Sequence, residues 1–197
     1  MLRYHKGFLN QLVDFDFETL ENNLSSVYAV DKEFKLIYFN KAYFDFAQSN
    51  NGEPYLSQKY PLGSYLPDAI YGNIKGFYLD KLKQIILSGK SEHLIYECSS
   101  SNTYRQFMQK LYPLRNKSGI VIINSLNVES PVEHDEKSFS ENYLQETGFI
   151  NQCSNCRRTQ SAINNALWDW VPIYISKMPS NMSHTICPIC YDYYWKN

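Results

Sequence analysis

The stretch 27-VYAVDKEFKLIYFNKAY-43 decides how the first half of the chain folds. Residues 27–30 and 34–39 are short runs rich in β-branched and aromatic side chains, which is the composition of strands. The charged residues between them are typical of a tight turn. Asn40 can cap a helix over residues 41–48, because its side-chain oxygen can accept a hydrogen bond from an unpaired backbone N–H of the first turn. The stretch therefore predicts two neighbouring strands followed by a helix.

The segments around this stretch extend the same pattern. An apolar stripe over residues 1–22 predicts an N-terminal helix, whereas the prolines and glycines of residues 49–72 predict short helices and loops. A helical period returns in the stretch 73-NIKGFYLDKLKQIILSGK-90, and Gly89 is a plausible stop. Three further strands are expected at residues 93–99, 104–114 and 119–128.

This ordered combination resembles a PAS domain over about residues 22–128. The resemblance is carried by the opening stretch, by "LGSYL", by "ILSGKSEHLIYE" and by "FMQKLYPLRNKSGIVI". It implies an α+β protein in which a five-stranded antiparallel sheet has helices on one face. We expect an N-terminal helix at 1–21, the PAS domain at 22–128, a linker at 129–149 and a small C-terminal module at 150–197.

The resemblance also implies an apolar cavity that can hold haem, flavin or a small metabolite. The helical stretch 73–90 contains no histidine, so the haem-ligand position of oxygen-sensing members is missing, and the flavin-photoreceptor cysteine motif is missing too. Cys98 lies on a predicted strand and is expected to be a small buried residue. A ligand of unknown identity stays open, with aromatic side chains that either line a pocket or simply form core: Tyr28, Phe44, Phe77, Tyr78, Tyr96 and Phe107.

Four of the five cysteines form two pairs near the C-terminus, Cys153-Ser-Asn-Cys156 and Cys187-Pro-Ile-Cys190. Each CxxC can turn so that both sulfurs face one point, and two such turns supply four thiolates at about 2.3 Å from a zinc ion. Four thiolates close the coordination shell, so the predicted zinc is structural rather than catalytic. A short module with few aliphatic residues also needs such a cross-link to fold.

Other interpretations of the cysteines are weaker. A thioredoxin-like redox pair uses one CxxC and leaves the second unexplained, and c-type haem attachment requires a histidine directly after the pair. A rubredoxin-like iron site has similar spacing but normally has glycine after each second cysteine, where this chain has Arg157 and Tyr191; iron is the second choice. Disulfides are disfavoured in a reducing compartment. His184 is a substitute ligand at most, and we expect it to be a loop residue.

The order of the module resembles a tail that follows PAS domains in bacterial signalling proteins. The matching parts are "CSNCRR", Trp168 and Trp170, "VPIYIS" and "SHTICPIC". The resemblance covers nearly all of residues 150–195 and implies a zinc-binding appendage to a sensor, with Cys153, Cys156, Cys187 and Cys190 as ligands.

Composition and charge limit the function. The chain is 44% hydrophobic with a net charge of −1, and residues 151–197 carry only +2, which is a poor footprint for nucleic acid. No signal peptide or membrane-spanning run is present, so we expect a cytoplasmic location.

We therefore expect a non-catalytic PAS sensor or interaction protein with structural zinc and a protein partner. We expect it to dimerise through its N-terminal helix. The alternatives are a zinc module that binds nucleic acid under PAS control and a rubredoxin-like iron redox protein.

Overall fold

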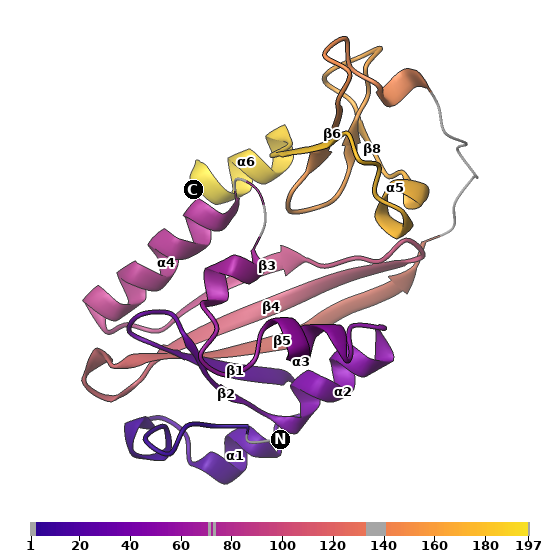
Figure 1. Ribbon diagram of the computed structural model, residues 1–197. Helices are drawn as coiled ribbons and strands as arrows, with labels where there is room; N and C mark the ends of the chain where they lie inside the picture. Colours follow the sequence, from indigo (N-terminus) through magenta and orange to yellow (C-terminus); the bar gives the residue numbers. More distant parts are fainter. Residues whose placement is uncertain (1–2, 71, 73, 133–140, 197) are drawn as a thin grey trace. The chain divides into compact units, whose positions relative to one another are not determined.

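A computed structural model describes residues 3–70, 72, 74–132 and 141–196 of the chain (Figure 1). The contacts between residues group the chain into two compact units. The first unit comprises Met1–Ile70, Tyr78–Ile95 and Met108–Leu126, and the second comprises Tyr71–Phe77, Tyr96–Phe107 and Asn127–Asn197. The second unit therefore includes the C-terminal module together with one end of three strands. The domain boundaries expected at residues 21, 128 and 149 remain predictions.

The main sheet has five strands in the order β2-β1-β5-β4-β3. The strands are β1 (Ser26–Asp31), β2 (Leu36–Phe39), β3 (Glu92–Glu97), β4 (Thr103–Pro113) and β5 (Gly119–Pro131). β1 pairs antiparallel with both β2 and β5. This mixed α+β arrangement, with helices inserted between β2 and β3, is consistent with the predicted PAS-like fold.

Helices follow β2 as the sequence predicts. They are α2 (Lys41–Ser49), α3 (Tyr55–Lys59), the 3-10 turn η2 (Leu66–Ala69) and α4 (Ile74–Ser88), and a further 3-10 turn, η3 (Arg115–Lys117), separates β4 from β5. α2 begins at Asn40, whose Oδ1 accepts from the backbone N–H of Tyr43 at 2.9 Å. α4 ends before Gly89, which has a φ of +70°, a conformation that glycine adopts without steric cost.

The N-terminal segment differs from its prediction. The described part of this segment forms only the 3-10 turn η1 (Leu9–Gln11) and the short helix α1 (Phe17–Glu21), so the continuous N-terminal helix was wrong. One cause is Asp16, whose side chain accepts from the backbone N–H of Thr19 at 2.7 Å and starts a new helix there. Tyr4 instead forms an antiparallel bridge with Tyr38 at the edge of β2.

The N-terminal segment covers one face of the sheet. Its buried side chains Phe8, Leu12 and Leu20 pack in one cluster with sheet residues that include Val27, Ala29, Val121 and Ile123. The alternating residue Tyr28 points to the opposite face, where its ring lies 6.1 Å from that of Tyr43 on α2. Helices thus cover one face of the sheet, as expected, and the N-terminal segment covers the other face.

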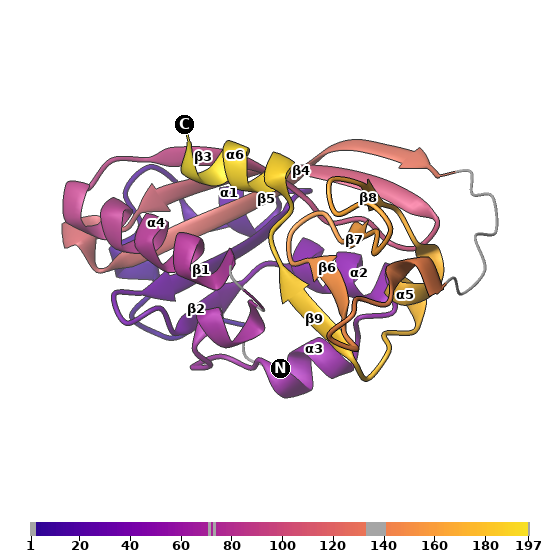
Figure 2. The same cartoon turned by 90° about the horizontal axis from the view of Figure 1, so that it is seen from above.

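The module contains a second, four-stranded sheet in the order β8-β7-β6-β9 (Figure 2). Its strands are β6 (Ile150–Cys153), β7 (Thr159–Gln160), β8 (Trp168–Asp169) and β9 (Met182–Thr185), and its helical pieces are η4 (Glu141–Tyr143), α5 (Pro172–Ser176) and α6 (Pro188–Trp195). Tyr143, Ile150, Val171 and Tyr174 form a small buried core. A core of four residues is too small to hold such a module alone.

Candidate metal centre

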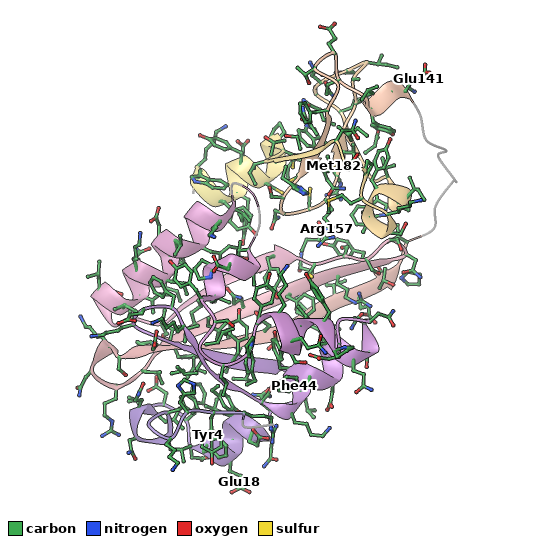
Figure 3. All side chains as sticks on the ribbon, viewed as in Figure 1. Tyr4, Glu18, Phe44, Glu141, Arg157 and Met182 are labelled. Carbon is green, nitrogen blue, oxygen red and sulfur yellow. The ribbon has the colours of Figure 1, made fainter. Side chains whose placement is uncertain are left out.

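The first cysteine pair lies at the end of β6 and in the turn that follows it: Cys153 is the last residue of β6, and Cys156 lies in the turn toward β7. The backbone N–H of Cys153 donates to the carbonyl of Arg158 at 2.8 Å, and that of Arg157 donates to the carbonyl of Cys153 at 3.0 Å. These two bonds fold residues 154–156 into a tight loop that turns Cys156 back toward Cys153. Arg157, labelled in Figure 3, closes the loop with a φ of +60°.

The second cysteine pair lies at the start of α6. Cys187 is the N-cap residue, and Pro188 occupies the first helical position, where its fixed φ favours a helix and its missing N–H is not needed. The backbone N–H of Tyr191 donates to the carbonyl of Cys187 at 2.8 Å. Cys190 therefore stands in the first turn, on the same end of the helix as Cys187.

Parallel pairing of β6 with β9 brings the two pairs together. In this pairing Cys153 lies opposite Thr185, two residues before Cys187. The backbone N–H of Cys187 then reaches the sulfur of Cys153 at 3.4 Å. The 33 residues between these two cysteines thus bring the chain back to the side of Cys153.

The four predicted ligands Cys153, Cys156, Cys187 and Cys190 form one buried cluster. Their sulfur atoms all lie within 4.8 Å of one another, and Cys156 Sγ lies 3.6 Å from Cys187 Sγ. That distance is far too long for a disulfide. Four sulfurs at about 2.3 Å from a central ion are separated by about 3.8 Å from one another, so the cluster has the dimensions of a tetrahedral metal site.

The four thiols strongly affect the ionisation of one another. Hydrogen bonds from the other three cysteines hold the pKa of Cys153 far below its usual value. The pKa of Cys156 falls to about 7, because bonds with Cys187 and Cys190 outweigh the opposing effect of Cys153. Hydrogen bonds to Cys153 and Cys156 raise the pKa of Cys187, and the same partners raise that of Cys190. Four thiolates this close together repel one another, and a divalent metal ion would offset their charge.

A second layer of polar groups fixes the ligands. Asn155 Nδ2 donates to Cys190 Sγ at 3.3 Å, and Asn155 Oδ1 accepts from the hydroxyl of Tyr194 at 3.1 Å. Tyr194 is buried on α6. Sequence reasoning missed both roles, although an Asn inside a CxxC loop and a Tyr one turn beyond the second pair were available signals.

The other histidine and cysteine candidates lie outside the cluster. His184 lies on β9 rather than in a loop, and burial followed by the charge of Arg157 lowers its pKa. Cys98 follows the last residue of β3 and is exposed, so its expected burial was wrong. Strand β3 ends one residue earlier, which removes Cys98 from the alternating pattern.

The backbone of the first cysteine loop bears on the choice between zinc and iron. Arg157 adopts the left-handed backbone conformation that glycine normally provides after the second cysteine of such a loop. Its side chain therefore does not exclude that loop geometry. The second pair differs, because Tyr191 continues α6 instead of closing a second loop.

The helix-facing side of the main sheet holds a separate polar cluster that the sequence analysis did not identify. Gln109 Nε2 donates to Asn124 Oδ1 at 2.9 Å, and both residues are buried. The hydroxyl of Tyr28 lies 3.5 Å from the same Gln109 nitrogen. Burial raises the pKa of Tyr28 to about 12, against the smaller effects of Asn124 and Gln109. Polar residues at inward positions of β4 and β5 were the available signal.

No family model matches the chain, and no curated protein sequence matches it. A crystal structure of the phage VqmA-DPO complex is 13% identical over 55% of this chain and 50% of that chain, with a TM-score of 0.41. A PAS domain from a two-component sensor histidine kinase is 13% identical over 56% of this chain and 91% of that chain, with a TM-score of 0.38.

This chain thus spans about half the length of the first of these structures. Likeness at this level does not define the class of protein. The strand order and the cysteine cluster do: this is an α+β protein with a PAS-like sheet and a module that carries four clustered cysteines. Within the described ranges, none of the helices combines the length and the apolar character that crossing a membrane requires.

Proposed function

We propose that this chain is a cytoplasmic PAS-type sensor or interaction protein, without catalytic activity, whose C-terminal module is held by a structural zinc ion. Zinc accepts four thiolates in a tetrahedral shell and, so bound, has no open position for a reacting water. Its role in such a shell is to fix the fold of the module. Signal transduction would proceed by binding at the PAS-like unit and by contacts with a protein partner.

The closed cysteine cluster is the observation that carries this proposal. The cluster is anchored within the second unit to the ends of the main-sheet strands. Arg158, next to the first cysteine loop, forms an ion pair with Glu97 at the end of β3. Trp170 Nε1 also donates to the carbonyl of Ser101, between β3 and β4, at 3.4 Å. A module fixed in this way presents a defined surface for a partner.

The predicted homodimer belongs to the same proposal. Phe8, Leu12 and Leu20 of the N-terminal segment are buried within the chain itself. A dimer surface there would therefore use Leu9 and Val13, which are 40% and 59% exposed.

Elemental analysis and native mass spectrometry of the purified protein test the proposal. We expect one zinc per chain, no visible absorption from iron, and loss of the metal when Cys187→Ser removes one ligand. Cys98→Ser is the matched control, because Cys98 is exposed and lies outside the cluster; this variant should retain its zinc. A red protein with stoichiometric iron, or a Cys187→Ser variant with full zinc and unchanged stability, would contradict the zinc assignment.

A further inference from the structure

A pocket of about 320 Å³ lies in the first unit, between the end of β2 and helices α2 and α3. Its walls include Phe39, Tyr43, Phe44, Ser57 and Tyr60, together with His5 of the N-terminal segment. The volume is at the lower end of the range found for small-molecule sites. Of the six aromatic residues for which the sequence left pocket or core open, Phe44 lines this pocket; its place on α2 is marked in Figure 3.

Three of the wall residues form an aromatic group. The ring centroids of Phe39 and Tyr43 lie 4.6 Å apart, those of Phe39 and Phe44 lie 5.6 Å apart, and those of Tyr43 and Phe44 lie 5.3 Å apart. The planes of these rings are tilted by 39° to 83° relative to one another, so they do not stack. These rings line the pocket together, and the π face of an aromatic ring attracts a cation.

The same helix α3 already shows this attraction within the chain. The ammonium group of Lys59 lies 5.3 Å from the ring centre of Tyr60, and it donates a hydrogen bond to the hydroxyl of Tyr55 at 2.6 Å. Tyr60 is also a wall of the pocket. An ammonium ion is therefore a group that the aromatic side chains at this end of the unit accommodate.

A carboxylate next to the pocket lacks a partner for one of its oxygens. The hydroxyl of Ser57, in the pocket wall, donates to Glu53 Oε2 at 2.6 Å. Glu53 Oε1 is buried and receives no hydrogen bond from any residue that the structure describes. Burial raises the pKa of Tyr43 in the same wall, and the charge of Glu53 adds to this effect. A buried acceptor without a partner is costly, and a bound cation would offset that cost.

We propose that this pocket binds a small organic ammonium ion with alkyl groups on its nitrogen. The aromatic rings would surround the alkylated nitrogen, and Glu53 would supply the opposite charge. A metal ion is a poorer occupant, because hard cations need several oxygen ligands and the walls are mainly aromatic. This inference rests on the proposed sensor function, for which it names the class of ligand.

Titration of the zinc-loaded full chain with choline and tetramethylammonium, followed by calorimetry, tests the proposal. We expect saturable binding of at least one of them, and at least about tenfold weaker binding of 3,3-dimethylbutan-1-ol, the uncharged isostere of choline. Glu53→Gln should weaken binding of the cation by about tenfold. Glu33→Gln is the matched control, since Glu33 is exposed and outside the pocket, and should leave binding unchanged.

The proposal is overturned if neither cation binds at millimolar concentration, if the alcohol binds as well as choline, or if Glu53→Gln has no effect. Thermal unfolding of each variant shows whether it is folded. If Glu53→Gln is not folded, Phe44→Leu takes its place as the variant that should weaken binding of the cation. Zinc content and partner binding are measured separately. Failure of the pocket therefore leaves the zinc-bound interaction protein to be judged by its own experiment.

Discussion

Arg158 Nη1 lies 3.6 Å from Glu97 Oε2, which joins the residue two positions after Cys156 to the end of strand β3. Burial raises the pKa of Glu97, while the hydroxyl of Ser99 and the charge of Arg158 lower it. Burial lowers the pKa of Arg158, but the neighbouring Cys156 and Glu97 outweigh it and leave the pKa above its usual value. Each partner of this pair thus limits the cost of burying the other.

Removing the Arg158–Glu97 pair should weaken the second unit by a modest amount. We expect Arg158→Ala to lower the free energy of unfolding of the metal-loaded protein by about 1–2 kcal/mol, because Glu97 is left with its burial uncompensated. Urea unfolding measures the change. In a double-mutant cycle with Glu97→Gln, the two substitutions should not be additive; strict additivity would show that the ion pair contributes nothing.

Arg157 offers a test of the backbone of the first cysteine loop. Its φ of +60° is the conformation that costs an L-residue roughly 1 kcal/mol and costs glycine nothing. We expect Arg157→Gly to leave the stability of the folded, metal-loaded protein unchanged or raise it by up to about 1 kcal/mol. Arg157→Val should lower it, since a β-branched residue is strained there.

Thermal unfolding of the two variants, each with its metal content measured, gives the comparison. Arg157→Ala is the control for loss of charge alone. If valine is tolerated as well as glycine, the left-handed turn does not contribute to the stability of the site.

The sequence predicts the parts of this molecule that depend on local patterns, and misses those that depend on contacts between distant residues. The strands around Asn40 and the cysteine spacing carry local signals, and the structure contains both features. The N-terminal segment shows this limit, because its apolar stripe fits a continuous helix as well as it fits the turn and short helix that the structure contains. The pairing of Tyr4 with Tyr38, across 34 positions of sequence, favours an extended start.

The cysteine site likewise combines features that follow from local sequence patterns with features that depend on contacts between distant residues. The four cysteines follow from spacing, whereas the link from Asn155 to Tyr194 depends on the parallel pairing of β6 with β9, which no local pattern specifies. The polar pair Gln109 and Asn124 is likewise visible only once β4 and β5 are in register.

Asn155 should slow the release of the metal. Its amide donates to Cys190 Sγ, and its oxygen holds the hydroxyl of Tyr194. Partners of metal ligands typically change metal affinity by about 10–100-fold when removed, so we expect Asn155→Ala to weaken metal binding by about tenfold or more. Competition with a chelating dye measures the affinity.

Tyr194→Phe separates the two contacts of Asn155. This variant keeps the aromatic ring that packs 4.7 Å from Phe77 but removes the hydroxyl, so its effect should be smaller than that of Asn155→Ala. Equal metal affinity in the wild type and in Asn155→Ala would contradict a role for Asn155 at the cluster.

The raised pKa of Tyr28 predicts how the stability of the folded chain changes at alkaline pH. Burial raises its pKa to about 12 in the folded chain, against about 10 in the unfolded chain. Between these values the folded state binds more protons than the unfolded state, so stability from this residue is complete below pH 10 and declines as the pH rises toward 12. Tyr28→Phe should remove this part of the decline.

Absorbance at the tyrosinate band, compared between wild type and Tyr28→Phe, reports the ionisation directly. The difference spectrum should appear only near pH 12. Ionisation of Tyr28 near pH 10 in the folded protein would show that its hydroxyl is open to water instead of lying in the polar cluster with Gln109.

Asn40 is the residue whose loss should damage the first unit most. Its side chain is fully buried. Its Oδ1 accepts from the backbone N–H groups of Val27 and Tyr43, each at 2.9 Å. Its Nδ2 lies between 2.9 and 3.3 Å from three backbone carbonyls, those of Leu20, Asn23 and Ser25. One side chain thus joins the segment after α1 to strand β1 and to the start of α2.

We expect Asn40→Ala to lower the free energy of unfolding by about 3 kcal/mol or more, because it removes a helix cap and leaves several buried backbone groups without partners. Asn40→Asp is the informative comparison. It keeps the cap acceptor but places a carboxylate against three carbonyl oxygens, so it should be nearly as harmful as alanine. Asn50→Ala, at the other end of the same helix, is the control and should cost less. Chemical denaturation measures all three, and an Asn40→Asp variant as stable as the wild type would show that the helix cap alone explains the residue.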